Sequence, residues 1–308
     1  MTLKQIFMKK LLVIGGSGLV GGTLIEYGVG SYDIFATYNK NEICNDKIKI
    51  SKINLSHEPS MIIKLITEIN PDVVVHLASH SSVDLCETDH NSADFLHVEV
   101  TKNIANICAQ INSKLIYLST EWVFEGELNK KYTEDDIPHP INYYGITKLF
   151  AEKLILTSSP NNVVLRTAVI YGYHKNSRFT NWILPYISQN KTVDPFIDQY
   201  GTPTLVDDLA KVILKIIDLN VKGLFHATGK TCINRYEFAL KLADTFGFDK
   251  SLIKPVTKHE KKQDAPRPTS TCLDSQKLEH ALDFSFSDIE LGVSFIYSKF
   301  KNNNSILM

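Results

Sequence analysis

Short apolar runs alternate with longer segments of helical spacing along the first 170 residues of the chain. The runs are continuous rather than alternating, as in strands that are buried on both faces of a parallel sheet. Between them, apolar residues recur three and four positions apart, which predicts helices that bury one face. The predicted strands span residues 10–14, 34–38, 48–55, 72–77, 114–118 and 163–165, and the predicted helices begin at Pro59 or span 92–110 and 143–156. This βαβ order predicts an α/β fold with a doubly wound parallel sheet.

A glycine-rich turn follows the first predicted strand. Residues 15–21 read GGSGLVG, and apolar residues of helical spacing come next. Gly15 permits the tight turn, Gly18 lets the backbone approach a pyrophosphate, and Gly21 lets the helix pack closely on the strand. The helix N-terminus offers free N–H groups to the phosphates of a dinucleotide. The residues of this predicted cofactor site are Gly15, Ser17, Gly18, Leu19, Val20 and Gly21, and an ordinary glycine-rich turn is the alternative interpretation.

The alternation loosens after about residue 170, where prolines interrupt shorter elements. The clearest element of this part is a predicted helix over residues 234–246. We therefore expect an NAD(P)-binding Rossmann domain over residues 8–170 and a smaller, mainly substrate-binding region over 171–301, from which the chain can return to the sheet. Residues 302–308 are expected to form a flexible tail.

Composition narrows the classes of protein that fit. Apolar residues make up 44% of the chain and charged residues 22%, as in an ordinary globular protein. The net charge of −1 gives no electrostatic case for nucleic acid or an anionic membrane surface. No apolar stretch approaches the ~18 residues that a membrane span needs. The odd number of cysteines, without a C-x-x-C pair, predicts reduced thiols in a cytoplasm and no metal site: Cys44, Cys86, Cys108, Cys232 and Cys272.

The end of the second predicted strand bears on the choice of cofactor. The acidic residue that holds the ribose 2′-hydroxyl of NAD is missing there, and Asn39 and Lys40 stand in its place. Asn39 is neutral, and Lys40 could neutralise a 2′-phosphate. The sequence therefore favours NADP(H), with NAD(H) as the alternative, while the competing interpretation of Lys40 is a solvated loop lysine.

Tyr144 and Lys148 lie four residues apart on the predicted helix over 143–156, so that their side chains share one face. A free phenol has a pKa of about 10, and a nearby ammonium lowers it toward the working pH. Tyr144 is therefore the predicted proton donor. Tyr297 and Lys301 repeat the spacing, but they follow the last predicted βα unit and are interpreted as part of a surface helix.

A third polar group is expected at the carboxyl end of the fifth predicted strand, where open α/β sheets bind their ligands. Thr120 follows Ser119 at this strand end, and successive strand residues point to opposite faces. Thr120 is the residue that we expect to hydrogen-bond a substrate carbonyl oxygen.

Further segments accompany these motifs in a fixed order along nearly the whole chain. Residues 119–126, for example, read STEWVFEG. In this series the chain resembles the extended short-chain dehydrogenases/reductases and, within them, the dTDP-4-dehydrorhamnose reductase family. The other segments that carry the resemblance are residues 15–21, 75–78, 83–87, 144–148, 165–167, 171–172, 200–210, 223–226 and 265–268.

The resemblance implies reduction of the C4 ketone of a dTDP-linked 6-deoxyhexose by NAD(P)H. It implies Thr120, Tyr144 and Lys148 as the catalytic triad, with Tyr144 and Lys148 also binding the cofactor. A homodimer is compatible with it. The further contacts that it implies are Asn54 and Leu55 beside the adenine, Ala78 against the cofactor, and Thr120, Glu121, Trp122 and Arg267 facing the nucleotide-sugar.

Four positions depart from the family pattern and leave the sugar and the base open. Glu121 replaces an aspartate, Trp122 a tyrosine, Val169 a sugar-contacting tryptophan and His97 a structural asparagine. Two alternatives therefore remain. Glu121 could serve a nucleotide-sugar epimerase or dehydratase as an acid or base, although the second acidic residue expected at position 122 is absent. The chain also resembles the non-catalytic, NADP-binding regulatory subunit of methionine adenosyltransferase, including its segment before the tyrosine helix, residues 136–138.

Overall fold

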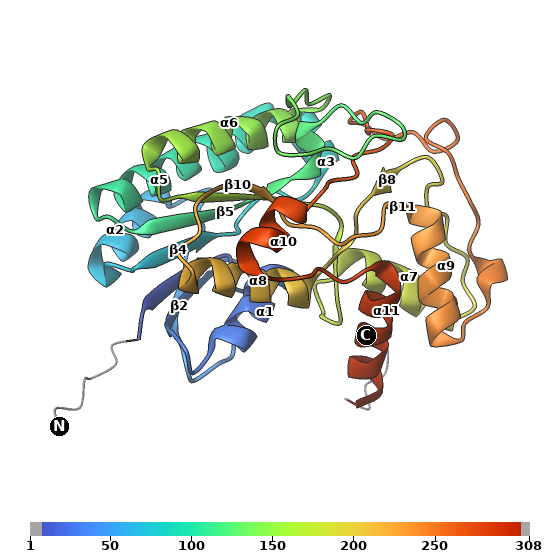
Figure 1. Cartoon of the computed structure of the whole chain (residues 1–308), viewed down its shortest axis with the longest axis horizontal. Helices are drawn as coiled ribbons and strands as arrows, with labels where there is room; N and C mark the ends of the chain where they lie inside the picture. Colours follow the sequence, from blue (N-terminus) through green and yellow to red (C-terminus); the bar gives the residue numbers. More distant parts are fainter. Residues whose placement is uncertain (1–7, 303–308) are drawn as a thin grey trace.

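A parallel sheet of seven strands forms the centre of the computed structural model, which describes residues 8–302 (Figure 1). Every pairing in this sheet is parallel, and β1 lies inside it with crossovers running to both sides. In spatial order the strands are β10 (Gly223–His226), β6 (Val163–Thr167), β5 (Lys114–Thr120), β4 (Val73–His76), β1 (Lys10–Ile14), β2 (Asp33–Tyr38) and β3 (Lys49–Lys52). The predicted doubly wound α/β fold is confirmed.

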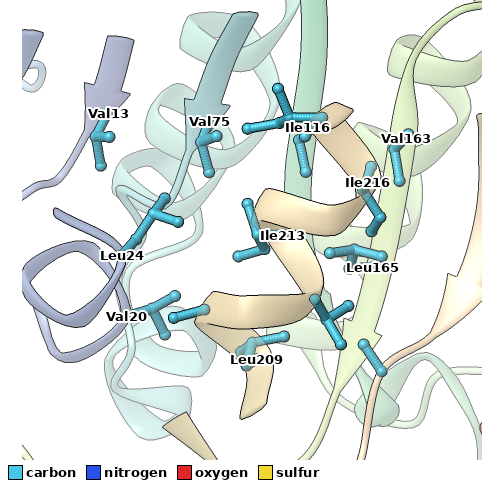
Figure 2. Close-up of a cluster of buried hydrophobic side chains, with 14 of the residues drawn as sticks. Val13, Val20, Leu24, Val75, Ile116, Val163, Leu165, Leu209, Ile213 and Ile216 are labelled. Carbon is cyan, nitrogen blue, oxygen red and sulfur yellow. The ribbon is translucent and has the colours of Figure 1, made fainter. Parts of the chain in front are cut away.

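Helices cover both faces of the sheet and divide its side chains into two apolar clusters. On one face lie α1 (Leu19–Gly28), α8 (Val206–Asp218) and α10 (Gln276–Leu282), and on the other α2 (Pro59–Ile69), α5 (Val100–Gln110) and α6 (Tyr143–Ser158). Because strand residues alternate between faces, Leu11 and Val13 join the first cluster and Leu12 and Ile14 the second. Figure 2 shows the first cluster, in which α1 and α8 pack their apolar residues against the sheet.

The second half of the chain supplies both an edge of this sheet and a separate helical body. β10 pairs with β6 at the edge, and α8 packs against α1. The remaining helices, α7 (Arg178–Ser188), α9 (Arg235–Phe246) and α11 (Ile289–Asn302), gather beyond the sheet around their own apolar cluster (Figure 1). Two small ladders connect them: β7 (Ile170–Tyr171) with β9 (Thr204–Leu205), and β8 (Tyr200–Gly201) with β11 (Ile233–Asn234).

Short helices complete the structure: α3 (Val83–Thr88), α4 (His90–Asp94) and the 3₁₀ turns η2 (Glu121–Val123) and η3 (Lys250–Leu252). None of the helices between residues 8 and 302 has the length and apolar character of a membrane span. The expected tail over 302–308 lies outside the described residues, apart from the last residue of α11.

Two predicted elements differ in detail from the structure. The helix predicted over 92–110 is divided into α4, a π-helical turn η1 (Phe95–Glu99) and α5. The strand predicted over 48–55 is paired as a strand only over β3, at the edge of the sheet, and one further hydrogen bond joins Ile53 N to Tyr38 O at 2.9 Å. Ile53 and Leu55 leave the strand but still bury their side chains in the second cluster, which accounts for the apolar pattern.

The expectation of five reduced thiols is wrong for one pair, since Cys232 and Cys272 form a disulfide with Cα atoms 5.5 Å apart. They are 40 residues apart in sequence. Strand β8 brings them together, because Tyr200 pairs with Asn234 on one side and with Ser270 on the other. The sequence contains no local signal of this pairing. Cys44, Cys86 and Cys108 are free.

Replacing Cys232 with Ser is expected to lower the free energy of unfolding by roughly 2–4 kcal/mol, because the bond restricts a long loop in the unfolded chain. Urea unfolding of the wild type with and without dithiothreitol should show the same difference, since Cys232 is at the surface. Cys44→Ser, at an exposed free thiol, is the matched control and should change nothing. Equal midpoints in oxidising and reducing buffer would contradict the prediction.

Candidate active site

One cavity of about 860 Å³ opens at the carboxyl ends of the central strands. Its lining includes the turn after β1, the segment after β4 and the last residues of β5 and β6. At this edge the crossover connections leave β1 toward opposite sides of the sheet, which is the usual place for a ligand in an open α/β fold. The geometry therefore places the glycine turn and the tyrosine helix at one site.

The glycine turn has the backbone geometry of a phosphate cradle. Gly15 has a φ of +87°, which strongly favours glycine, and its carbonyl oxygen would lie 2.4 Å from a Cβ atom at position 21. The turn is held by a hydrogen bond from Gly16 N to Thr37 O of 2.8 Å. No side chain caps the N-terminus of α1, so its first N–H groups are available to an anion.

A second helix N-terminus contributes to the same cavity. Lys175, Arg178 and Asn181, at the start of α7, are among the lining residues. The loop before α7 is fixed against the glycine turn, because Asn176 Nδ2 donates a hydrogen bond of 2.7 Å to Ser17 O. Two helix N-termini and two cationic side chains therefore face one cavity. This arrangement suits bound molecules that carry more than one anionic group.

Helix α6 presents Tyr144 and Lys148 to the cavity. Asn142 caps the helix, with its Oδ1 accepting from Gly145 N at 2.9 Å. Lys148 Nζ is buried 4.0 Å from the centre of the Tyr117 ring and donates to Leu118 O at 2.7 Å. Burial lowers the pKa of Lys148 to about 7, although the Glu152 carboxylate one turn further acts to raise it. The expected lowering of the Tyr144 pKa is wrong for this structure, because burial raises it, and the hydroxyls of Thr120 and Ser79 act against that rise.

The end of β5 supplies a hydroxyl and a carboxyl group. Thr120 Oγ1 donates to Glu121 Oε2 at 3.1 Å and accepts from Trp122 N at 3.3 Å. Burial raises the pKa of Glu121 to about 7, while Arg235 and the neighbouring donors oppose the rise. Glu121 can therefore change charge near neutrality. The Ser119 hydroxyl donates instead to the buried carboxylate of Glu152.

The cavity at the carboxyl ends of the strands thus combines a glycine turn, a tyrosine–lysine pair and a threonine. Residues 8–302 match the family model of the RmlD substrate binding domain. The chain belongs to this family. The predicted assignment to the extended short-chain dehydrogenases/reductases and the dTDP-4-dehydrorhamnose reductase family is thereby confirmed.

Individual relatives of this RmlD-family chain differ in name. It is 29% identical to a dTDP-4-dehydrorhamnose reductase of Aggregatibacter actinomycetemcomitans, over 91% of the chain and 96% of that protein. It is 33% identical to methionine adenosyltransferase 2 subunit beta of Xenopus laevis, over 88% of the chain and 82% of that protein. The crystal structure of a dTDP-4-dehydrorhamnose reductase from Yersinia enterocolitica superposes with a TM-score of 0.83 at 27% identity, covering 95% of the chain and 99% of that structure.

Most site residues predicted for this RmlD-family chain lie in the cavity lining, and four do not. The residues in the lining are Gly15, Ser17, Gly18, Leu19, Val20, Gly21, Asn39, Leu55, Ala78, Thr120, Glu121, Tyr144 and Lys148. Lys40 is exposed outside the lining, and Asn54 uses its Oδ1 to accept from Ser56 N. Arg267 pairs with Asp84 at 2.7 Å and lies 5.1 Å from the ring centre of Trp122. Trp122 in turn stands edge-on to Tyr144, with ring centres 6.1 Å apart.

Sequence reasoning missed the cavity residues around the start of α7 of the RmlD-family chain. Lys175, Arg178 and Asn181 belong to no motif, although a helix beginning after residues 171–172 could have indicated an anion site. Ser79 was also missed, and it follows the motif at 75–78 directly. Between residues 8 and 302, no three histidine, cysteine or acidic side chains converge as they would around a metal ion.

Proposed function

We propose that this chain is an NADPH-dependent reductase of the C4 ketone of a nucleotide-linked 6-deoxyhexose. The observation that carries the proposal is the placement of Tyr144, Lys148 and Thr120 in the cavity that the glycine turn also lines. The residues present fit the cofactor: a cradle that a Cβ atom would fill, an uncapped helix N-terminus and a neutral Asn39 at the end of β2. Bound NADPH supplies the hydride for the ketone carbon.

The side chains of the chain supply the proton and stabilise the charge. Tyr144 donates its phenolic proton to the ketone oxygen as the negative charge develops there. The Thr120 hydroxyl turns from Glu121 and donates to the same oxygen. The Lys148 ammonium stabilises the phenolate that remains, and burial strengthens this attraction because the local dielectric is low.

The start of α7 supports a nucleotide diphosphate as part of the substrate. The glycine turn and α1 suit the pyrophosphate of the cofactor. Lys175, Arg178 and the N-terminus of α7 remain for a second diphosphate in the same cavity. We therefore assign the substrate to the nucleotide-sugars, with the sugar ring directed toward Tyr144 and Glu121.

A second candidate function is an NADP-binding regulatory subunit, which the 33% identity to a methionine adenosyltransferase subunit favours. The two candidates differ in turnover and agree in cofactor binding. An epimerase or dehydratase is less well supported, because Trp122 occupies the position where a second acidic group would be needed.

The direct test is coenzyme oxidation with a freshly prepared dTDP-4-dehydro-6-deoxyhexose, with NADPH and NADH in parallel. We expect NADPH consumption matched by formation of the 6-deoxyhexose. In Asn39→Asp the NADPH/NADH ratio of kcat/KM should fall by about tenfold or more, because a carboxylate at this place binds a ribose 2′-hydroxyl and repels a 2′-phosphate. Lys40→Ala is the matched control and should change the ratio much less, since Lys40 lies outside the cavity lining.

The absence of turnover in a protein that binds NADPH would reject the reductase and leave the regulatory subunit. Turnover with a strict preference for NADH would retain the reductase but reject the cofactor assignment.

The value of kcat/KM for NADPH should fall above about pH 7, where Lys148 loses its proton in the free enzyme. Tyr144 keeps its proton in that range because its pKa is raised. The Glu152 carboxylate holds the Lys148 pKa up, so Glu152→Gln should shift the alkaline limb to lower pH. Glu121 also titrates near neutrality, and Glu121→Gln should leave the position of the limb unchanged. If Glu121→Gln, and not Glu152→Gln, shifted the alkaline limb of the pH profile, the assignment of this limb to Lys148 would be contradicted.

A further inference from the structure

His97 lies in the π-helical turn η1, buried between the tyrosine helix and the segment after β4. Its Nε2 is 2.9 Å from both His80 N and Ser79 Oγ. Its Nδ1 is 2.9 Å from Thr147 Oγ1, which donates to the carbonyl oxygen of Tyr144 at 2.9 Å. The imidazole therefore connects the segment after β4 to helix α6. Its ring stands edge-on to that of Tyr144 with centres 5.7 Å apart.

The hydrogen bonds determine which nitrogen of His97 carries the proton. A backbone N–H can only donate, so Nε2 must accept from His80 N and carries no hydrogen. The proton of the neutral ring is therefore on Nδ1 and is donated to Thr147 Oγ1. Thr147 uses its own hydroxyl hydrogen on Tyr144 O, so it is free to accept. His97 Nδ1 donates to Thr147 Oγ1 and Thr147 Oγ1 donates to Tyr144 O, so the imidazole has one tautomer.

The Ser79 hydroxyl already has two acceptors within reach in the structure, His97 Nε2 at 2.9 Å and His80 O at 3.3 Å. Ser79 lines the cavity beside the Tyr144 phenol, and its interaction with that group favours the phenolate. While Tyr144 holds its proton, Ser79 donates to His97 Nε2 or to His80 O. When Tyr144 has given its proton away, the Ser79 hydroxyl can rotate and donate to the phenolate. His97 Nε2 keeps His80 N as a donor in both states.

We propose that His97 is a positioning residue that holds Ser79 against Tyr144, so that Ser79 stabilises the phenolate formed during reduction. This inference rests on the proposed function. It assigns Ser79 as a further group that touches the reacting phenol, and it gives the π-helical turn a role, because η1 carries His97.

His97 does not act as an acid or base in this scheme. Burial, together with the charge of Lys148 and the neighbouring His80 and His76, lowers its pKa to about 2. The only interaction opposing this shift is the bond from His80 N. The ring is therefore neutral throughout the pH range in which an enzyme of this kind works.

The tautomer can be measured without any substrate. Long-range ¹H–¹⁵N spectra of the full chain labelled with ¹⁵N-histidine, with the resonance assigned by His97→Gln, report the protonation of each ring nitrogen. We expect a hydrogen on Nδ1 and none on Nε2 of His97, unchanged between about pH 5 and 9. A hydrogen on Nε2, or titration within that range, would overturn the proposal.

Two substitutions separate positioning from folding. In His97→Gln the longer amide can place its oxygen where Nε2 lies and accept from His80 N and Ser79. In His97→Asn the shorter amide reaches only toward Thr147. We expect kcat of His97→Asn to fall by about tenfold to a hundredfold, with both KM values changed by less than about threefold, and His97→Gln to recover most of kcat. Equal losses in both variants, or a loss confined to KM, would overturn the proposal.

Ser79→Ala provides an independent test, because it removes a single hydroxyl at a half-buried position. It should lower kcat as His97→Asn does, and the double variant should lose little more, since both remove one interaction. Additive losses would count against the proposal. His226→Asn is the matched control at another buried, neutral histidine, whose Nδ1 is 3.2 Å from Asp274 O far from Tyr144. If the wild type turns over no nucleotide-sugar, the proposed function fails, while the tautomer measurement still tests the arrangement of His97.

Discussion

Replacing Tyr144 with Phe is expected to lower kcat by about a thousandfold, or about 4 kcal/mol of transition-state stabilisation. The substitution removes one oxygen atom and with it the proton for the developing alkoxide. The ring remains, so its edge-on contacts with Trp122 and His97 persist. Cofactor binding should change little, because the glycine turn and Lys148 are untouched. Single-turnover measurements with NADPH, together with fluorescence titration of the cofactor, separate the two effects.

The matched control is Tyr297→Phe, which removes a phenol with the same four-residue spacing to a lysine. In α11, Lys301 lies 4.6 Å from the centre of the Tyr297 ring, but neither side chain lines the cavity. This variant should keep the kcat of the wild type. A Tyr144→Phe enzyme with more than about a tenth of the wild-type kcat would show that another group delivers the proton.

Replacing Glu152 with Ala is expected to lower the free energy of unfolding by about 4 kcal/mol. Glu152 and Arg166 form an ion pair across α6 and β6, with 2% and 3% of their side chains exposed. Arg166 Nη2 and Nε donate to the carboxylate at 2.8 and 3.0 Å, and Ser119 donates to it as well. Alanine would leave the guanidinium buried without a counter-charge, and that penalty exceeds the loss of the attraction itself.

Urea unfolding of Glu152→Ala, Arg166→Met and the double variant tests this explanation. The double variant should recover much of the loss, because removing both charges also removes the cost of burying one alone. A double variant that is as unstable as the sum of the two single ones would show that the losses come from packing instead. Glu152→Ala should also lower the Lys148 pKa, because the carboxylate is the main group that raises it.

The hydrophobic pattern of the sequence was sufficient for six of the seven strands of the sheet, because strands that are buried on both faces must be apolar throughout. It did not mark β10, the strand that the second half of the chain adds at the edge. It was less informative at the edge, where β3 has one neighbour and its apolar pattern continues beyond its hydrogen bonds. It could not show that the helix predicted over 92–110 contains the π-turn η1, since one inserted residue changes the spacing of apolar positions very little. The Cys232–Cys272 bond depends on the ladder around β8 and has no local signal.

At the site, the residues that belong to a local motif were predictable, and those brought in from a distance were not. The glycine turn, Tyr144 and Lys148 owe their placement to one turn or one helix. Lys175 and Arg178 reach the cavity only because the loop before α7 is fixed on the glycine turn. The role of Ser79 depends on His97 across the cavity wall, and no spacing along the chain relates the two residues.

During synthesis on the ribosome, six strands of the sheet emerge before the segment that completes them. α8 and β10 follow only at residues 206–226, so β6 remains an open edge until then. The face of α1 that carries Val20 and Leu24 also waits for α8 to cover it (Figure 2). At about 5–20 residues per second, roughly three to twelve seconds pass between synthesis of the end of β6 and the end of β10, and the α1 face is exposed for longer still. In that interval a chaperone has an apolar surface to hold, and a second nascent chain has an edge to which it can pair.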